Sequence, residues 1–308
     1  MDTGKTLIGV DIGGTFIKAG AVRNGRIIKN VSFPTPLSCA EALFGEVNRI
    51  IGILGSECVP VDAVGIGIPG TISPAGVIGH SPNLPIDGFK ALDFFRKSQA
   101  CPVAVDNDAN MAAVGERLYG SARGCGNFVL LTLGTGVGSG IFIGGELFHG
   151  PGGFAGEIGH MVISETGPTC KCGNRGCLET LASGSAIIRT GREIIEKFPG
   201  SSLAEFCGNE EITAYKIFQA AEAGEGQARN IFAETGYHLG TGIHNLCNIL
   251  NPELVVIGGG VAGAGKWFLP EIKKVLSNSS FESAHTLKVE ISPLKNQAAI
   301  LGAASYYL

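Results

Sequence analysis

The chain has 308 residues, 48 of them glycine, with 16% charged residues and a formal net charge of −4. This length and composition predict a globular enzyme of two domains, rich in tight turns and loops lined by backbone. No stretch is rich in lysine and arginine, so the charge gives no support for nucleic-acid binding. No apolar stretch reaches the roughly 18 residues of a membrane helix, and the first residues lack the layout of a signal peptide. We therefore expect a cytoplasmic protein with neither nucleic-acid nor membrane partners.

The chain begins with a predicted strand at residues 6–11, a glycine turn, and two further strands at 16–22 and 26–33. A glycine turn between strands exposes several backbone N–H groups in one concavity, which suits a phosphate. The carboxylate at the strand end could hold Mg²⁺ through water, and a nearby lysine could add a cation. The residues of this candidate phosphate site are Asp11, Gly13, Gly14, Thr15 and Lys18. The alternative is a simple hairpin turn.

Two further candidates for substrate binding, Gly70 and Asn83, come later. Gly70 follows a predicted strand that begins near residue 63, and Asn83 lies in a loop between two prolines. The prolines stiffen the loop, which suits an amide held toward a ligand, although Asn83 would serve equally well as a turn residue.

Asp108 lies between a short predicted strand at 102–106 and a predicted helix at 111–119. A carboxylate at such a junction could act as a general base, taking a proton from a substrate hydroxyl that attacks phosphorus. Its position fits a helix N-cap equally well. Asn107 could bind a neighbouring hydroxyl, whereas we interpret Asp106 as structural.

The plan of the first three strands recurs at residues 127–143, where two predicted strands, at 127–133 and 139–143, flank a second glycine turn. This internal duplication favours two facing phosphate loops over two unrelated hairpins. Neither turn is a P-loop, because each is followed by a strand rather than a helix. The candidate residues of the second turn are Gly134, Thr135 and Gly136.

A third glycine segment follows a predicted strand at 253–257 and contains Gly258, Gly259 and Gly260. It matches G-x-G-x-x-G, but too little chain remains after it for a second nucleotide-binding half. We interpret it as a floor for adenine or ribose. Two alternatives are a glycine-rich junction between strand and helix and the cofactor site of a nicotinamide-dependent oxidoreductase.

Three cysteines and a histidine have a spacing suited to a divalent metal, with a glutamate near each end. Cysteine and histidine side chains are the preferred ligands of tetrahedral zinc, and four of them leave no position open for catalysis. We therefore predict a structural zinc site that fixes two acidic side chains, Glu157 and Glu179, which could accept hydrogen bonds from a polyhydroxyl ligand. The candidate ligands are His160, Cys170, Cys172 and Cys177. Buried thiols beside surface acids are the alternative.

Together these motifs resemble the ROK family of sugar kinases and sugar-responsive repressors, within the actin/hexokinase-like ATPase superfamily. The cysteine cluster with its flanking glutamates is the family's own signature. The resemblance implies that Asp108 is the catalytic base, that His160 binds both zinc and sugar, and that the three glycine segments bind ATP with Mg²⁺. The sugar-binding residues that it implies are Asn83, Asn107, Glu157, His160 and Glu179.

The resemblance also implies an α/β fold of two actin-like, ribonuclease H-like lobes, each with a central mixed sheet, closing a cleft over ATP and sugar. We expect the smaller lobe at residues 1–117, with a C-terminal helix near 296–308 that packs back onto it, and the larger lobe with the zinc loop at 118–295. The family commonly forms homodimers. Residues 86–89 depart from family glucokinases, which often carry a tryptophan in this loop.

We expect an ATP-dependent hexose kinase that phosphorylates O6 of glucose. N-acetylmannosamine, N-acetylglucosamine, allose and fructose remain open, because each presents several hydroxyls to the same acceptors. A sugar-sensing repressor is a further alternative. Such repressors carry a helix-turn-helix domain before the kinase-like part, for which we expect no room before Thr6.

Overall fold

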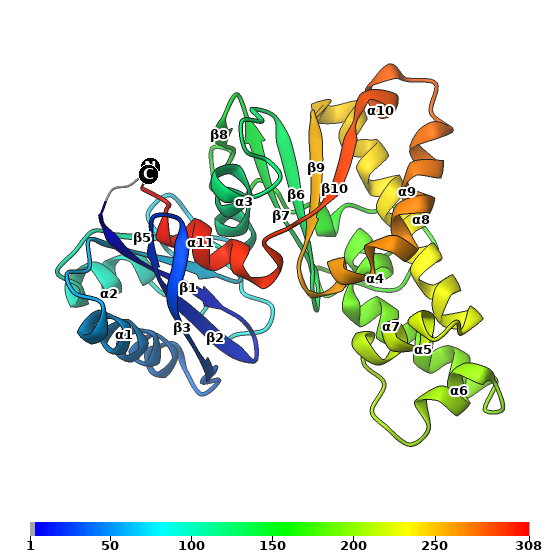
Figure 1. Ribbon diagram of the computed structural model, residues 1–308, viewed down its shortest axis with the longest axis horizontal. Coiled ribbons are helices and arrows are strands. Elements are labelled where there is room, and N and C mark those ends of the chain that lie inside the picture. Colours follow the sequence, from blue (N-terminus) through cyan, green and yellow to red (C-terminus); the bar gives the residue numbers. More distant parts are fainter. Residues whose placement is uncertain (1–3, 308) are drawn as a thin grey trace. The chain divides into compact units, whose positions relative to one another are not determined.

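The computed structural model describes residues 4–307, which form two five-stranded sheets with helices (Figure 1). The first sheet contains β1 (Thr6–Ile12), β2 (Phe16–Arg23), β3 (Arg26–Pro34), β4 (Ala63–Ile68) and β5 (Val103–Asn107). The second contains β6 (Phe128–Leu133), β7 (Val137–Ile143), β8 (Glu146–Leu147), β9 (Leu254–Gly258) and β10 (Lys288–Ile291). Their orders, β3-β2-β1-β4-β5 and β8-β7-β6-β9-β10, have the same plan. The predicted α/β duplication is confirmed.

The helices connect these strands and cover the sheets. In chain order they are α1 (Ala40–Glu57), α2 (Ala91–Ser98), α3 (Asp108–Tyr119), η1 (Ile158–His160), α4 (Leu178–Ala182), α5 (Gly184–Lys197), α6 (Ser202–Cys207), α7 (Ala214–Glu222), α8 (Gly226–Leu250), η2 (Gly260–Ala264), α9 (Gly265–Ser277), α10 (Glu282–Thr286), η3 (Lys295–Gln297) and α11 (Ala298–Ala304). None of the helices within residues 4–307 is long and apolar enough to cross a membrane.

The chain divides into two compact units. The first comprises Met1–Leu130, Gly140–Gly156 and Pro293–Leu308, and the second comprises Leu131–Ser139 and Glu157–Ser292. In the second unit, the long helix α8 packs against α9 and ends at Leu250, and the next residue, Asn251, adopts the left-handed conformation that terminates many helices.

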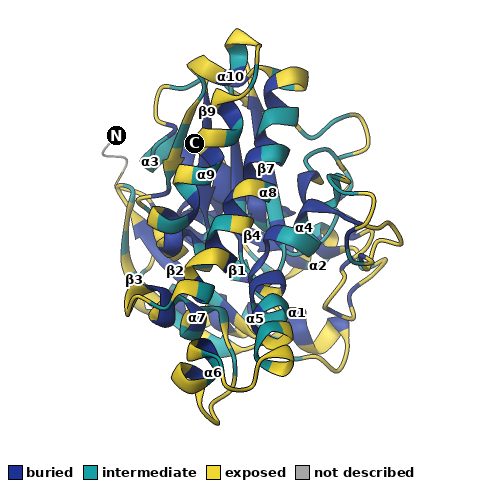
Figure 2. Ribbon diagram, turned by 90° about the vertical axis from the view of Figure 1, so that its right-hand side faces the viewer, coloured by how far each residue is buried: buried dark blue, intermediate teal, exposed yellow. Residues whose placement is uncertain are grey.

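In the first unit, the sheet is covered on both faces because its strands are apolar on both faces. Side chains of β1 alternate: Ile8 and Val10 join the core under α1 and α2, whereas Leu7 joins the cluster under α11. Helix α11 in turn packs against α3. The central strands β1 and β4 are accordingly the most deeply buried, whereas the edge strand β3 alternates between exposed and half-buried residues (Figure 2).

Helix α11 packs on the sheet and on α3 at unusually close range. A Cβ at Gly65 of β4 would overlap the backbone of Ala303, and one at Gly115 of α3 would overlap the backbone of Ala298. Glycine therefore lets helix and strand backbones meet directly, without an intervening side chain. This contact fixes the C-terminal segment on the face of the sheet that carries α3.

The structure corrects three predicted boundaries. Strand β7 begins at Val137 rather than at 139, so the second glycine turn is shorter than expected. Helix α3 begins at Asp108 rather than at 111, and the last helix covers only Ala298–Ala304 of the expected 296–308. At both helix ends, side-chain and backbone hydrogen bonds set the boundary, which apolar periodicity alone does not reveal.

Replacing Gly65 with alanine should destabilise the protein by about 3 kcal/mol, because the added methyl group forces α11 away from the sheet. Gly45→Ala is the matched control: Gly45 lies on the exposed face of α1 with nothing near its missing side chain, so alanine should stabilise by about 0.5–1 kcal/mol. Urea unfolding followed by circular dichroism measures both effects. Equal stabilities of the two variants would contradict the proposed close contact.

Candidate active site

The first glycine turn is held by bonds within itself and by Thr35, which follows β3. The backbone N–H of Gly13 donates to the carbonyl of Phe16 at 3.0 Å, closing the turn between β1 and β2. The hydroxyl of Thr35 donates to the carbonyl of Gly13 at 2.7 Å, and its backbone N–H donates to the carbonyl of Thr15 at 2.9 Å. Sequence reasoning missed Thr35. Only the β2–β3 register, in which Phe16 faces Pro34, could have indicated it.

Asp11 and Lys18 flank this turn on opposite strands, because the antiparallel register pairs them directly. Burial raises the pKa of the Asp11 carboxyl, and the charge of Lys18 opposes that shift. An acidic and a basic group thus lie beside a turn whose Gly14 and Thr15 are exposed. This donor and acceptor set suits a phosphate together with a hard cation.

The junction between β5 and α3 is capped by Asn107, not by Asp108. The side-chain oxygen of Asn107 accepts hydrogen bonds from the backbone N–H groups of Ala109 at 2.8 Å and Asn110 at 3.2 Å. Asp108 is the first helical residue, half-buried, and its Oδ1 also accepts from Ala109 N at 2.9 Å. The alternative role that we considered for Asp108, the N-cap of this helix, is therefore filled mainly by Asn107.

Asn83, Gly70 and the first glycine turn gather near this junction. The amide nitrogen of Asn107 donates to the carbonyl of Gly70 at 3.0 Å. A Cβ at Gly14 would lie 4.0 Å from the Cβ of Asn83, and one at Gly67 would lie 3.2 Å from the Cα of Asp108. The parallel strands β1, β4 and β5 thus bring their carboxyl ends together, which is where open α/β sheets commonly bind ligands.

The loop that carries Asn83 is shaped by Asp87, another residue that sequence reasoning missed. Its carboxylate accepts from the backbone N–H of Ser81 at 2.7 Å and contacts Nδ1 of His80 at 3.0 Å. These hydrogen bonds, the first from His80, lower the pKa of the Asp87 carboxyl. The loop ends are therefore held together around the exposed Asn83.

In the second unit, the second glycine turn is joined to Glu179. The backbone N–H of Val137 donates to Oε2 of Glu179 at 3.0 Å, and a Cβ at Gly136 would overlap that carboxylate. Gly134 donates to the carbonyl of Gly136 at 3.0 Å, and its own carbonyl accepts from Gly184 at 2.7 Å. Thr135, between these glycines, is exposed.

The third glycine segment packs against the strand that leads into the second turn. Gly259 has a φ of 85°, and a Cβ there would overlap the backbone of Leu133, the last residue of β6. Only glycine combines this backbone conformation with so close an approach. Gly258 ends β9 and Gly260 begins η2, so the segment is also a junction between strand and helix. The third glycine segment therefore adjoins the residue that precedes the second glycine turn.

Glu157 and Glu179 influence each other electrostatically, within reach of His160. Burial raises the pKa of the Glu157 carboxyl, the charge of Glu179 adds to the rise, and His160 opposes it. Oε2 of Glu157 lies 3.9 Å from Nε2 of His160, at the i, i+3 spacing of the short helix η1. Two carboxylates and an imidazole thus share one region of the second unit.

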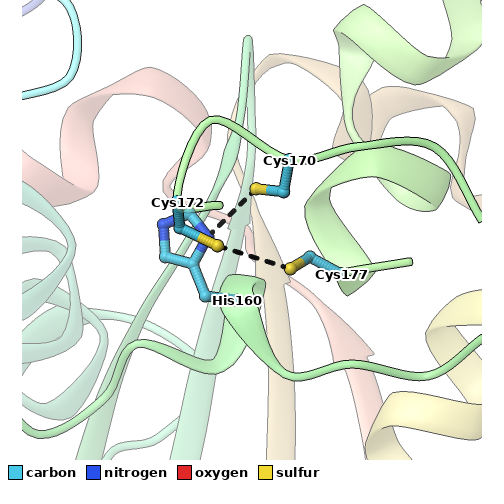
Figure 3. A group of neighbouring side chains, drawn as sticks. All are labelled: His160, Cys170, Cys172 and Cys177. Carbon is cyan, nitrogen blue, oxygen red and sulfur yellow. Dashed lines mark hydrogen bonds between the residues drawn. The ribbon is translucent and has the colours of Figure 1, made fainter. Parts of the chain in front are cut away.

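The four candidate metal ligands converge as their spacing predicts (Figure 3). Their ligand atoms all lie within 4.8 Å of one another. Sγ of Cys170 lies 3.5 Å from Nδ1 of His160, and the sulfurs of Cys172 and Cys177 lie 3.6 Å apart. Tetrahedral zinc with Zn–S of about 2.3 Å and Zn–N of about 2.0 Å places two sulfurs about 3.8 Å apart, and sulfur and nitrogen about 3.5 Å apart. These two separations agree with a tetrahedral zinc site.

The chemistry of the thiols agrees with a metal site. Burial raises the pKa of the Cys177 thiol to about 12, so a cation would be needed to hold it as the thiolate that metal coordination requires. Gly173 and Gly176 have φ of 95° and 68°, which let the loop turn back so that Cys170 N donates to the carbonyl of Asn174 at 2.7 Å. With Nδ1 of His160 facing the cysteines, its Nε2 is left on the side of Glu157.

The candidate residues thus form two groups, one in each unit. The first unit brings together the first glycine turn, Asn83, Gly70, Asn107 and Asp108. The second brings together the second and third glycine segments, Glu157, Glu179 and the cysteine cluster.

The chain matches a known family over nearly its full length: the sequence model of the ROK family matches residues 7–308. A glucokinase of Halalkalibacterium halodurans is 39% identical over 307 residues, covering 96% of this chain and 92% of that protein. A xylose repressor of Caldicellulosiruptor bescii is 36% identical over 253 residues, covering 82% of this chain and 61% of the repressor. The crystal structure of a ROK family glucokinase from Streptomyces griseus, in complex with glucose and AMPPNP, has a TM-score of 0.88 at 33% identity and covers 98% of both chains. The cysteine and histidine cluster fits the zinc motif of that family.

Replacing Cys172 with serine should remove most of the metal, because a serine hydroxyl is a far poorer zinc ligand than a thiolate. Elemental analysis of the unchanged protein should give about one zinc per chain. Cys39→Ser is the matched control, since Cys39 is an exposed thiol outside the cluster, and it should keep the metal. Full zinc content in Cys172→Ser would show that the ligand assignment is wrong.

Proposed function

Because the chain belongs to the ROK family, we propose that it is an ATP-dependent hexose kinase that phosphorylates O6 of glucose. The observation that carries the proposal is the arrangement of Asp108, half-buried at the start of α3, beside Asn107, Gly70 and the first glycine turn. A carboxylate beside a phosphate-binding turn can take a hydroxyl proton while the hydroxyl oxygen attacks the terminal phosphorus. A related ROK glucokinase has been crystallised with glucose and AMPPNP, which supports a sugar and a nucleotide as the ligands of this chain.

In this proposal Asp108 acts as the general base and Asn107 orients a neighbouring hydroxyl. Asn107 already donates from its amide to Gly70, so its side chain has a fixed direction. Fixing the acceptor and the hydroxyl in one geometry lowers the entropic part of the barrier. The attacking oxygen forms its bond to phosphorus as the bond to the ADP oxygen breaks, and the proton passes to the Asp108 carboxylate.

We assign the phosphates and the adenosine to the three glycine segments. Gly13, Gly14 and Thr15, with Lys18, would bind phosphate oxygens from the first turn, and Gly134, Thr135 and Gly136 from the second. Gly258, Gly259 and Gly260 would approach the adenosine. Asp11 fits Mg²⁺, which binds through one or two carboxylates and water and neutralises the charge of the transferred phosphate. Burial raises the pKa of the Asp11 carboxyl, and Lys18, paired with it across the strands, opposes that rise.

We assign the sugar to Gly70, Asn83, Asn107, Glu157, His160 and Glu179. Ionised carboxylates accept hydrogen bonds from hydroxyl groups, so Glu157 and Glu179 suit a neutral polyhydroxyl ligand. A structural zinc on His160 and the three cysteines would fix the imidazole and, through it, Glu157. The metal would therefore shape the sugar site without taking part in the transfer.

Two further parts of the proposal concern architecture. We propose lobes of residues 1–117 plus 296–308 and of residues 118–295 that close over the ligands, and a homodimer in solution. The family likeness supports both.

A sugar-responsive regulator is the second candidate function, because xylose repressors are related to this chain at 36% identity. Such a protein would bind sugar without consuming ATP. The nicotinamide-dependent oxidoreductase has no comparable support, since the family match extends over residues 7–308.

Replacing Asp108 with asparagine should reduce turnover by about 10²–10⁴-fold while leaving sugar affinity largely unchanged, because the amide cannot take the proton. Sugar-dependent ADP release in a coupled assay measures kcat, and calorimetry measures sugar binding. Asp93→Asn is the matched control: Asp93 lies on the first turn of α2, away from the candidate site. Near-normal turnover of Asp108→Asn would remove this residue from its role.

A panel of sugars should show the highest kcat/KM for glucose, with N-acetylmannosamine, N-acetylglucosamine, allose and fructose weaker. We expect glucose to rank first because it is the sugar bound in the related ROK glucokinase complex. ADP release measured for each sugar, with sugar-free reactions as controls, separates the functions. Sugar binding without stimulated ADP release would favour the regulator.

A further inference from the structure

The carboxylate of Asp106, two residues before Asp108, receives an unusually complete set of hydrogen bonds within the first unit. Its side chain is only 6% exposed. Oδ1 accepts from the backbone N–H of Asn107 at 2.7 Å and from the side-chain amide of Asn110 at 2.9 Å. Oδ2 lies 2.7 Å from Nε2 of His149 and accepts from the hydroxyl of Tyr306 at 2.7 Å. Both oxygens are therefore held in fixed directions.

The partners of Asp106 come from three parts of the chain that are distant in sequence. Asn107 and Asn110 belong to the junction of β5 and α3. His149 lies two residues after β8, and Tyr306 follows α11. We call Asp106, His149 and Tyr306 the Asp106 clasp. It ties the segment that carries the candidate base to a loop and to the C-terminal segment.

The electrostatics of the clasp favour an ion pair between Asp106 and His149. Burial alone would raise the pKa of Asp106, but hydrogen bonds from His149, Asn110 and Tyr306 outweigh it and lower that pKa. The hydrogen bond to Asp106 raises the pKa of His149 above its ordinary value, burial opposes the rise, and the backbone of Leu147 supports it. Both shifts in pKa favour the charged forms, in which the imidazolium of His149 donates to the carboxylate of Asp106.

His149 is itself held in place by its own loop. Its carbonyl accepts from the backbone N–H of Ala155 at 2.9 Å, and Gly153, with φ of 82°, packs against the carbonyl of Ile72. The side chain of His149 is 34% exposed, so it reaches a buried carboxylate from a partly solvated position. The imidazole is thus a fixed donor supplied from outside the junction.

Stability alone gives a weak reason for such an ion pair. Desolvating a charged pair commonly offsets its attraction, and apolar residues of similar size often stabilise as well or better. The pair instead fixes the orientation of the Asp106 carboxylate. His149 and Tyr306 hold its Oδ2, so that its Oδ1 accepts from the backbone N–H of Asn107. Asn107 in turn caps α3, whose first residue is Asp108.

We propose that His149 is a positioning residue for Asp108, acting through Asp106 and the cap at Asn107. This inference rests on the proposed role of Asp108 as the base. The hydrogen bond from His149 reaches Asp106, two residues before Asp108, so its effect is on the orientation of the junction. Displacement of a catalytic group by about 1 Å costs on the order of 100-fold in rate, so loss of the clasp should reduce kcat measurably.

His149→Leu removes the donor, whereas His149→Gln keeps an amide N–H at about the position of Nε2. His149→Leu should lower kcat by about 10–100-fold with unchanged calorimetric affinity for glucose. His149→Gln should recover most of this loss. Activities are compared per folded protein, at a temperature where circular dichroism shows both variants to be native.

Two comparisons separate positioning from a structural role. In the Asp108→Asn background, adding His149→Leu should cause little further loss, because residues that act through one group are not additive. Hydrogen exchange of the peptide that spans residues 105–112 should accelerate in His149→Leu and return toward normal in His149→Gln. If His149→Leu does not fold, Tyr306→Phe removes the second donor to the same oxygen and should lower kcat in the same direction.

An unchanged kcat in His149→Leu, or in Tyr306→Phe where that variant replaces it, would overturn the inference while leaving the proposed kinase intact. Equal losses in His149→Leu and His149→Gln would overturn it as well, since the donor would then be irrelevant. If the unchanged protein has no kinase activity, the proposed function fails, and the exchange measurement alone decides whether His149 orders the junction.

Discussion

The first unit depends on a direct backbone contact between α11, the sheet and α3. Four glycines, at positions 9, 65, 115 and 302, leave the space that this contact needs. Because no side chains intervene, α11 lies close enough for Tyr306 to reach the carboxylate of Asp106 at the end of β5. The last residues of the chain thus take part in ordering a junction about 200 residues earlier.

The same contact explains why the candidate catalytic group lies on rigid elements. Asp108 begins a helix that is packed against α11 and capped by Asn107, and the neighbouring strand ends supply Gly70 and the first glycine turn. A general base must be held within hydrogen-bond reach of one oxygen, so it benefits from a scaffold with few alternative conformations. The more open residues of the candidate site, Gly14, Thr15 and Asn83, are exposed.

The second unit achieves comparable order with other means. A short loop rich in glycine brings three thiols to an imidazole, with all four ligand atoms within 4.8 Å of one another. Glu157 and Glu179 lie close to the first and last of these ligands in the sequence, so the positions of the ligands also place the two carboxylates. Glu179 accepts from the backbone of the second glycine turn. A carboxylate suited to a sugar and a turn suited to a phosphate are therefore joined by one hydrogen bond.

Motifs with local spacing could be predicted from the sequence, whereas long-range contacts could not. The glycine turns, the cysteine cluster and the repeated strand plan depend on neighbouring residues, and the structure contains all of them, although the second glycine turn is shorter than expected. The capping role of Asn107 was missed because Asp and Asn cap helices equally well. Thr35, His149 and Tyr306 carry no local signal, since each acts on a partner that only the tertiary fold brings near. The identity of the hexose depends on pocket shape, which no motif encodes.

The account would be tested most directly by a crystal structure of the chain with glucose and a non-hydrolysable ATP analogue. We predict that O6 of glucose lies within about 2.6–3.2 Å of the Asp108 carboxylate and faces the terminal phosphorus. A structure in which glucose and nucleotide are far apart, or in which Asp108 contacts neither of them, would contradict the account.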